Sequence, residues 1–165
     1  MDAARVHAPP SIVVERVVPA AVPHVVADRD KVRQVLVNLV ENAMKYSPGG
    51  GRIEVGLESG EESGAETVVF FVRDEGLGIP ADEQARIFEK FYRLDPHMTR
   101  GVGGTGLGLY ICSELVNRMG GHIWVESTEG EGSTFLLELP AEPQPVVQPL
   151  PSVASPERQP AESDH

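Results

Sequence analysis

One stretch of the sequence carries polar side chains at helical spacing. Gln34, Asn38, Asn42 and Lys45 are four, four and three residues apart, so on a helix they form a single polar stripe. The two asparagine amides offer neutral oxygen ligands for a hard cation, and the lysine offers a positive charge for phosphate. Spacing alone favours the alternative of a solvated helix face. Two asparagines in mid-helix nevertheless require a reason, because Asn is a poor helix former.

A second group of residues directly follows a predicted strand over residues 67–73. Asp74 stands at the strand end, and Gly76 and Gly78 come two and four residues later, before Ile79 and Pro80. Close glycines let a flat ligand approach the backbone, and a carboxylate can accept a hydrogen bond from an exocyclic amine such as that of adenine. On this segment alone, an ordinary turn would be the favoured interpretation.

The third group is a glycine-rich stretch over residues 101–108, where a predicted helix begins. Backbone N–H groups at such a helix start suit phosphate, and a flexible loop is the alternative. The stretch matches G-x-G-x-x-G, but the sequence before it, FYRLDPHMTR, does not resemble a strand, so a dinucleotide-binding fold is not indicated. No Gly-Lys pair occurs in the sequence, which excludes a P-loop.

The hydrophobic pattern predicts the elements that must position these groups. A helix is expected from a cap at Asp28 or Asp30 to about Tyr46, with an apolar stripe beside the polar one. Further helices are expected over 81–88 and 106–119, and strands over 11–18, 24–27, 52–57, 67–73, 122–127 and 133–139. Since strands and helices mix without strict alternation, we expect an α+β sandwich.

Composition bounds the domain organisation and the partners. The 165 residues suit one domain, and a formal net charge of −11 argues against bulk electrostatic binding of nucleic acid or an anionic membrane. Half of the 14 prolines lie from Pro140 onward, so 141–165 is predicted to be a disordered or polyproline-like tail. Cys112, the single cysteine, is expected to be a small buried apolar residue. The sequence contains no apolar run long enough to span a bilayer and no secretion signal, so a cytoplasmic location is expected.

In their order along the chain, these motifs resemble those of the ATP-binding catalytic domain of bacterial sensor histidine kinases. This domain belongs to the superfamily shared with gyrase, heat-shock chaperone and mismatch-repair ATPases. The segment QVLVNLVENAMKYS is similar to the family's N box, DEGLGIP to its G1 box, IFEKFYR to its F box and GGTGLGL to its G2 box. The resemblance covers about residues 10–140, which implies a catalytic domain over 11–140, preceded by a disordered segment or linker start at 1–10.

The resemblance implies a two-layer α/β sandwich, with a mixed sheet on helices and ATP beneath a flexible lid. It implies that Asn42 coordinates Mg²⁺ with support from Asn38, that Lys45 meets phosphate, and that Tyr46 packs on adenine. Asp74 would accept the adenine amine with a water that Thr134 also holds. The remaining implied site residues are Gly76, Gly78 and Ile79 near the base, Phe88 and Phe91 as lid anchors, Lys90 and Arg93 as lid cations, and Gly103, Gly104, Thr105, Gly106, Leu107 and Gly108 around the triphosphate.

The implied activity is transfer of the γ-phosphate of ATP to a histidine on a separate dimerisation domain, with a response regulator further along. None of the five histidines is followed by Asp or Glu, so the family's acceptor motif is missing here. Hydrolysing members of the superfamily place a Glu at the position of Asn38, so slow ATP hydrolysis is expected. Two alternatives stay open: a nucleotide-binding module without transfer activity, and a stand-alone serine kinase of the same superfamily. The signal sensed and any membrane attachment of a longer parent protein stay open as well.

Overall fold

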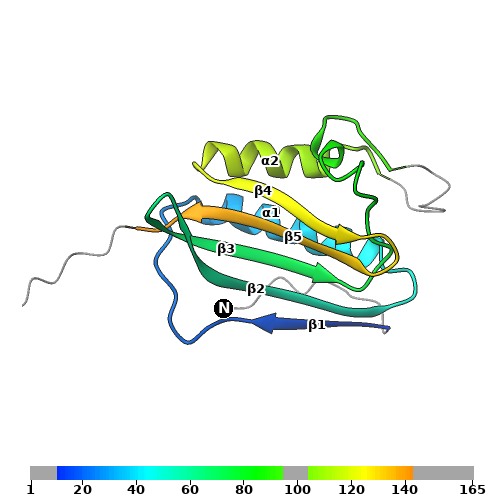
Figure 1. The fold of residues 1–165 in the computed structure, drawn as a ribbon, viewed down its shortest axis with the longest axis horizontal. Helices are drawn as coiled ribbons and strands as arrows, with labels where there is room; N and C mark the ends of the chain where they lie inside the picture. Colours follow the sequence, from blue (N-terminus) through cyan, green and yellow to red (C-terminus); the bar gives the residue numbers. More distant parts are fainter. Residues whose placement is uncertain (1–10, 95–103, 143–165) are drawn as a thin grey trace, which may run out of the picture.

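A computed structural model describes residues 11–94 and 104–142. Within these residues, five strands form one mixed sheet in the order β1-β2-β3-β5-β4 (Figure 1). The strands are β1 (Ile12–Val17), β2 (Gly51–Glu62), β3 (Ala65–Asp74), β4 (His122–Thr128) and β5 (Gly132–Pro140). The helices are α1 (Arg29–Lys45), α2 (Gly108–Arg118) and the short 3-10 helix η1 (Arg86–Phe88). β1 pairs with β2 in parallel, and the other neighbouring strands pair antiparallel.

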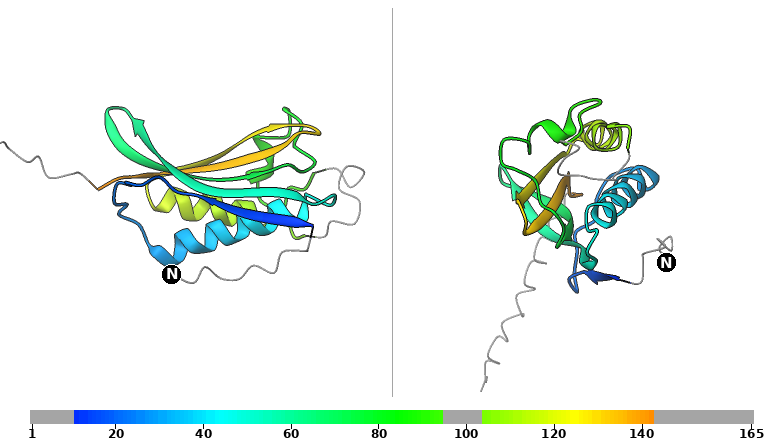
Figure 2. Two further views of the ribbon diagram at one scale, coloured as in Figure 1. Left: turned by 90° about the horizontal axis from the view of Figure 1, so that it is seen from below. Right: turned by 90° about the vertical axis from the view of Figure 1, so that its right-hand side faces the viewer.

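The two long helices lie side by side on one face of the sheet, and the other face carries no helix among the described residues (Figure 2). The core lies between the layers and includes Val35 and Leu39 of α1, Val116 of α2, and Ile53 and Leu137 of the sheet. The hydrophobic stripe of each helix is thereby removed from water, which is the main force that holds the layers together. The predicted α+β sandwich is confirmed.

Several element boundaries differ from the predictions. β2 and β3 are longer than expected because the acidic and glycine-containing segment between them continues the strands, and the turn itself is made at Ser63 and Gly64. The predicted strand over 24–27 was wrong: in this fully described segment, Val25 forms one isolated bridge with Ala141. The predicted helix over 81–88 was also wrong, because turns precede the short η1. Residues 24–27 lack the ladder to a neighbouring strand, and the backbone hydrogen bonds of residues 80–88 are mainly three-residue turns.

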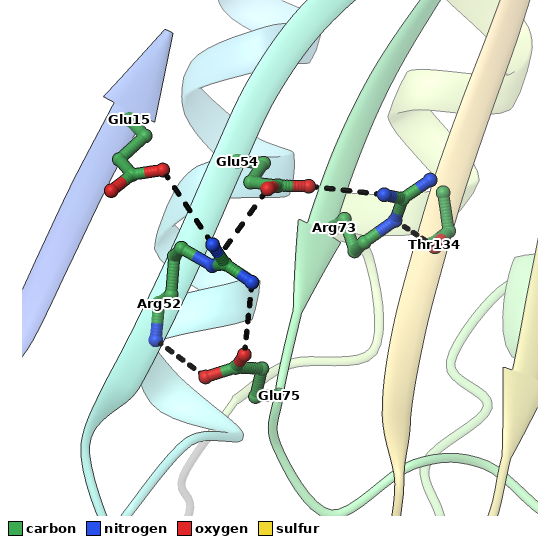
Figure 3. A network of polar contacts seen from close by, with 6 residues as sticks. All are labelled: Glu15, Arg52, Glu54, Arg73, Glu75 and Thr134. Carbon is green, nitrogen blue, oxygen red and sulfur yellow. Dashed lines mark hydrogen bonds and ion pairs between the residues drawn. The ribbon is translucent and has the colours of Figure 1, made fainter. Parts of the chain in front are cut away.

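The open face of the sheet carries a chain of ion pairs that a hydrogen bond extends to a fourth strand (Figure 3). Arg52 of β2 lies 3.9 Å from Glu15, 3.7 Å from Glu54 and 3.5 Å from Glu75. Arg73 of β3 continues the chain, because its guanidinium lies 3.0 Å from Glu54 and donates to the Thr134 hydroxyl of β5 at 3.3 Å. Pairs this exposed each add little stability.

Candidate functional site

α1 presents two polar side chains to a cavity of about 220 Å³ between the helices and one end of the sheet. The helix begins after Asp28, whose carboxylate accepts the backbone N–H groups of Asp30 and Lys31 at 2.9 and 3.2 Å. Burial of the apolar stripe of α1 against the sheet fixes the rotation of the helix. As a result, Asn42 and Lys45 line the cavity near the C-terminal end of α1.

Asn38 lies one turn before Asn42 and outside the cavity lining. It sits against the N-terminal end of α2, where a Cβ atom on Gly108 would come within 3.0 Å of the Asn38 amide. A side chain at position 108 would require the Asn38 amide to shift by a few tenths of an ångström, and glycine permits the close approach. Asn38 also borders an exposed groove on α1 that includes Gln34 and Glu41.

Asp74 forms the buried polar group of the cavity, and only 5% of its surface is exposed. Its Oδ1 atom accepts the backbone N–H of Gly76 at 2.9 Å, and the backbone N–H of Ser133 also donates to its carboxylate. Burial raises the pKa of Asp74 above its usual range, and these two N–H groups oppose the rise by favouring the charged form. The carboxylate is therefore held in place as an acceptor at the cavity wall.

The loop after Asp74 approaches two other backbone segments closely. The N–H of Leu77 donates to the carbonyl of Tyr46 at 3.0 Å, and a Cβ atom on Gly76 would collide with the same carbonyl. Gly78 has φ of +69°, and a Cβ atom there would collide with the carbonyl oxygen of Thr128. Glycine is required at position 78 by both conformation and space.

A hydrogen-bond cluster ties this loop to the β4–β5 hairpin. The Ser127 hydroxyl accepts the N–H of Ile79 at 2.8 Å, donates to the carbonyl of Gly132 at 2.8 Å, and lies 2.9 Å from the Ser133 hydroxyl. The amide of Gln84 donates to the carbonyls of Ile79 at 3.0 Å and Ser127 at 2.8 Å. Ile79 and Ser133 both line the cavity, so this cluster fixes the spacing of its wall.

The start of α2 and the segment after η1 close the other side of the cavity. Gly104 approaches Lys45 so closely that a Cβ atom would lie 2.8 Å from the lysine Nζ. The N–H of Phe91 donates to the carbonyl of Gly106 at 2.9 Å, which holds the two segments together. Arg93 lines the cavity and lowers the pKa of Tyr46, although burial is the larger effect and raises it overall. Lys45 and Arg93 thus place two positive charges at the cavity.

The rest of the wall is mainly apolar and was not predicted from the sequence. Ile87, Tyr92, Leu94, Leu109 and Phe135 line the cavity together with Ser133. Burial alternates over residues 133–137 of β5, which places Ser133 and Phe135 on the helix-facing side, and Asp74 pairs with Ser133 in the sheet. The sequence offers only a weak signal for this orientation, because Leu136 is apolar as well as Phe135 and Leu137.

The structure brings many of the predicted site residues together. Those that line the cavity are Asn42, Lys45, Tyr46, Asp74, Gly78, Ile79, Arg93, Gly104, Thr105, Gly106 and Gly108. Those that are described but do not line it are Asn38, Gly76, Phe88, Lys90, Phe91, Leu107 and Thr134. Gly103 lies outside the described residues.

Thr134, the expected partner of Asp74 through water, faces the open side of the sheet and accepts the hydrogen bond from Arg73. Phe88 packs edge-on against Phe135 at 6.3 Å, as an anchor would. Phe91, in contrast, is 65% exposed and is held through its backbone.

Lys90 lies at the surface, where its Nζ is 5.3 Å from the ring centre of Phe91 and 5.8 Å from that of Tyr110. In this arrangement, Arg93 is the one of the two expected lid cations that reaches the cavity.

The fold and the cavity define an ATP-binding domain class, and sequence comparison agrees. A family model described as "Histidine kinase-, DNA gyrase B-, and HSP90-like ATPase" matches residues 27–143, and the chain belongs to this family. The resemblance that the motifs indicated is thereby confirmed.

Within that family, curated relatives are sensor histidine kinases. The chain is 46% identical over 117 residues to sensor histidine kinase WalK of Bacillus subtilis, covering 71% of the chain and 19% of the relative. It is 41% identical over 134 residues to the circadian input-output histidine kinase CikA of Synechococcus elongatus, covering 76% of the chain and 17% of that protein. The chain therefore spans less than a fifth of the length of these relatives.

Solved structures of histidine kinases share the fold. Full-length ShkA in complex with AMPPNP matches with a TM-score of 0.66 and 35% identity, over 79% of this chain and 26% of that one. The mycobacterial sensor histidine kinase MprB matches with a TM-score of 0.66 and 29% identity, over 81% and 85% of the two chains. The catalytic domain of histidine kinase ThkA matches with a TM-score of 0.64 and 32% identity, over 81% and 82%.

Proposed function

We propose that this chain binds Mg-ATP and is the catalytic module that transfers the γ-phosphate to a histidine on a separate dimerisation domain, in two-component signalling. The observation that carries the proposal is the cavity itself. It has one buried carboxylate beside a largely apolar wall that also contains Ser133, and an amide and two cations elsewhere in its lining. A buried acceptor suits a base with an exocyclic amine, and the cations suit a polyphosphate.

The adenine base would lie against the apolar wall and donate its amine to Asp74. Ile79, Leu109 and Phe135 supply apolar surface, and Tyr46 supplies an aromatic one. We propose that Ser133 takes the role that the resemblance gave to Thr134, because Ser133 lines the cavity and its backbone N–H already bonds to Asp74. Its hydroxyl can hold a water next to that carboxylate.

The phosphates would lie toward Asn42, Lys45 and Arg93. The Asn42 amide would supply an oxygen ligand of the kind that a hard cation such as Mg²⁺ prefers. Mg²⁺ supplies charge neutralisation on the phosphates when bound. Lys45 and Arg93 add positive charge from the protein, and the backbone at Gly104–Gly108 leaves room at the start of α2.

The chemistry is in-line displacement at the γ-phosphorus. A nitrogen of the acceptor imidazole forms the new P–N bond, the bond from the γ-phosphorus to the bridging oxygen breaks, and ADP leaves with that oxygen. The protein contributes positioning and charge stabilisation. His24 and His122, the two histidines within the described residues, do not line the cavity, which supports an acceptor on another domain.

Hydrolysis of ATP by water is proposed to be slow. A general base must lie within hydrogen-bonding reach of the attacking water. Asn38 is an amide and cannot take a proton, and Glu41 borders the exposed groove on α1, away from the cavity lining. Asp74, the one carboxylate among the residues that line the cavity, lies with the base-binding residues at the end of β3.

We propose that the catalytic domain spans residues 11–140, that the dimerisation domain of a longer parent protein is its direct partner, and that a response regulator receives the phosphate later. No helix in the described residues is long and apolar enough to cross a membrane. The acidic balance of the chain supports a module that acts without nucleic acid or direct membrane contact, and we propose that it works in the cytoplasm.

The proposal is tested by mixing the chain with Mg-ATP labelled at the γ-phosphate and with the dimerisation domain of the parent protein. We expect phosphate on that domain that is stable in alkali and released by acid, as phosphohistidine is. An acceptor domain whose histidine is changed to alanine is the control, and it should stay unlabelled.

Each other outcome points to a different function. Tight ATP binding without transfer would favour a nucleotide-binding module that has no kinase activity. Acid-stable phosphoserine on a partner protein would favour a serine kinase. Failure of the chain to bind ATP would refute all three assignments.

A further inference from the structure

Three metal-ligating side chains gather at the end of the sheet remote from the cavity. They are Glu62 at the end of β2, His122 at the start of β4 and Glu138 near the end of β5, and their nearest ligand atoms all lie within 4.8 Å of one another. Figure 1 shows the β2–β3 hairpin, the start of β4 and the end of β5 at the same end of the sheet, while α2 begins at the other end. The cluster thus joins segments that are distant in the sequence.

Glu138 is almost buried, with 9% of its surface exposed, which is unusual for a glutamate. One carboxylate oxygen, Oε1, accepts a short hydrogen bond from the Thr67 hydroxyl, which fixes the orientation of the group. The other oxygen, Oε2, faces Nε2 of His122 at 3.6 Å, which is longer than a hydrogen bond. A carboxylate this buried favours a positively charged partner such as a metal cation.

The histidine is held in a position suited to bind a metal. Its ring stacks on Trp124 at a centroid distance of 4.7 Å and an interplanar angle of 22°, which restricts its rotation. Nε2 is the atom that faces Glu138. A neutral imidazole nitrogen and two carboxylate oxygens form a mixed donor set, which suits zinc and related transition metals better than Mg²⁺.

The geometry points to a binding site for a divalent transition-metal cation, formed by Glu62, His122 and Glu138. Ligands at about 2.0–2.2 Å from a zinc ion lie roughly 3.2–3.6 Å apart in a tetrahedral site. Glu62 is exposed and can rotate to close its separation from the other two, while Glu138 stays fixed by Thr67 and its Oε2 already lies 3.6 Å from Nε2 of His122. Water takes the fourth position. Because the site lies on the open face of the sheet, it is separate from the proposed ATP site.

Metal binding would link the β2–β3 hairpin to the β4–β5 pair. The turn of the hairpin at Ser63 and Gly64 is exposed, so this end of the sheet has few packing contacts of its own. The expected consequence is slower amide exchange over residues 60–67, together with a higher unfolding temperature. ATP affinity should be unchanged, because no ligand of the metal lines the cavity.

The test is titration of the full chain with Zn²⁺ in competition with a chromophoric chelator at pH 7.5, without nucleotide. We expect one zinc per chain, with at least tenfold weaker binding in His122→Ala and in Glu62→Gln. Both side chains are exposed, so these variants should fold normally. His24→Ala removes another exposed histidine and Glu61→Gln another exposed acid of the same hairpin, and both should bind like the parent chain.

A second measurement separates this site from adventitious zinc. Hydrogen exchange with and without Zn²⁺ should show protection over 60–67 in the parent chain and none in His122→Ala. Equal zinc affinity in the parent chain and in His122→Ala would overturn the proposal. So would an absence of binding at one equivalent, or protection that is unchanged by the substitution.

Discussion

Replacing Asp74 by Asn tests the central claim about the cavity, that a buried carboxylate recognises the exocyclic amine of adenine. The substitution keeps the size of the side chain and removes its charge. A hydrogen bond to a charged acceptor contributes about 1.5–3 kcal/mol, and about 1.4 kcal/mol corresponds to a tenfold change in affinity. ATP affinity should therefore fall by roughly ten- to a hundredfold, measured by isothermal titration calorimetry. Asp82→Asn removes an exposed carboxylate and should leave ATP affinity unchanged.

The contact can be isolated with a nucleotide that lacks the amine. Purine riboside triphosphate differs from ATP by the missing 6-amino group and keeps the phosphates. The parent chain should prefer ATP over this analogue by about ten- to a hundredfold, and Asp74→Asn should show almost no preference. If the preference survives the substitution, Asp74 does not read the base and the assignment of the cavity wall is refuted.

Asp74→Asn also tests how the Asp74 carboxyl group affects the stability of the fold at different pH values. Because burial raises the pKa of Asp74 in the folded protein, its protonated form is favoured by folding, and the corresponding stability is lost as pH rises through that pKa. The asparagine side chain of the Asp74→Asn variant does not ionise, so the variant lacks this pH dependence. The free energy of unfolding of the parent chain, relative to that of the variant, should therefore fall as pH rises from the acidic range to neutral. Urea titrations at several pH values measure this difference, and a relative gain for the parent chain would contradict the cause assigned to the shift.

Three further predictions concern the metal ligand, the glycine loop and the cysteine. Asn42→Ala should abolish the Mg²⁺-dependent part of ATP binding, measured by calorimetry with and without the ion, and an unchanged Mg²⁺ dependence would exclude Asn42 as the ligand. Gly78→Ala should cost more than the ~1–3 kcal/mol expected for φ of +69° alone, because the new Cβ meets the Thr128 carbonyl. Gly64 has φ of +81° and open space around it, so Gly64→Ala measures the cost of the backbone conformation alone. If the two substitutions lower the free energy of unfolding equally in urea titrations, the collision with Thr128 is disproved. Cys112 is buried, which raises the pKa of its thiol to about 12, so a thiol reagent at pH 8 should label it only as fast as the chain unfolds.

The sequence predicted the elements whose patterns are regular. The apolar stripe of α1 repeats over several turns, and β5 is a short run rich in apolar residues, so both elements were found within a few residues of their ends. The segment after Leu57 was harder, because exposed acids and glycine at 58–62 resemble a turn. Their strand is held by the ladder to β3, which is a long-range interaction that local sequence does not display.

Site residues could be predicted where a polar or charged residue stands at an unexpected place in a helix or at the end of a strand. Asn42, Lys45 and Asp74 stood out in the sequence, and all three line the cavity. The apolar wall was missed because Leu109 and Phe135 look like any other core residues until the fold is known. Thr134 was expected at the cavity but faces the open side of the sheet. Neighbouring residues of a strand point to opposite faces, so a shift of one position along β5 exchanges Thr134 for Ser133.

The direction of β1 has a consequence for any domain that precedes it. Ile12 pairs with Gly51, and the N–H of Arg52 next to it donates to Glu75, so the chain enters the sheet beside the loop that follows Asp74. β5, in contrast, ends at the far end of the sheet (Figure 1). A domain joined before Ser11 is therefore tethered on the cavity side. A short tether there would keep an attached acceptor at an effective concentration of the order of millimolar, so that transfer could be rapid even if the two domains bind each other weakly.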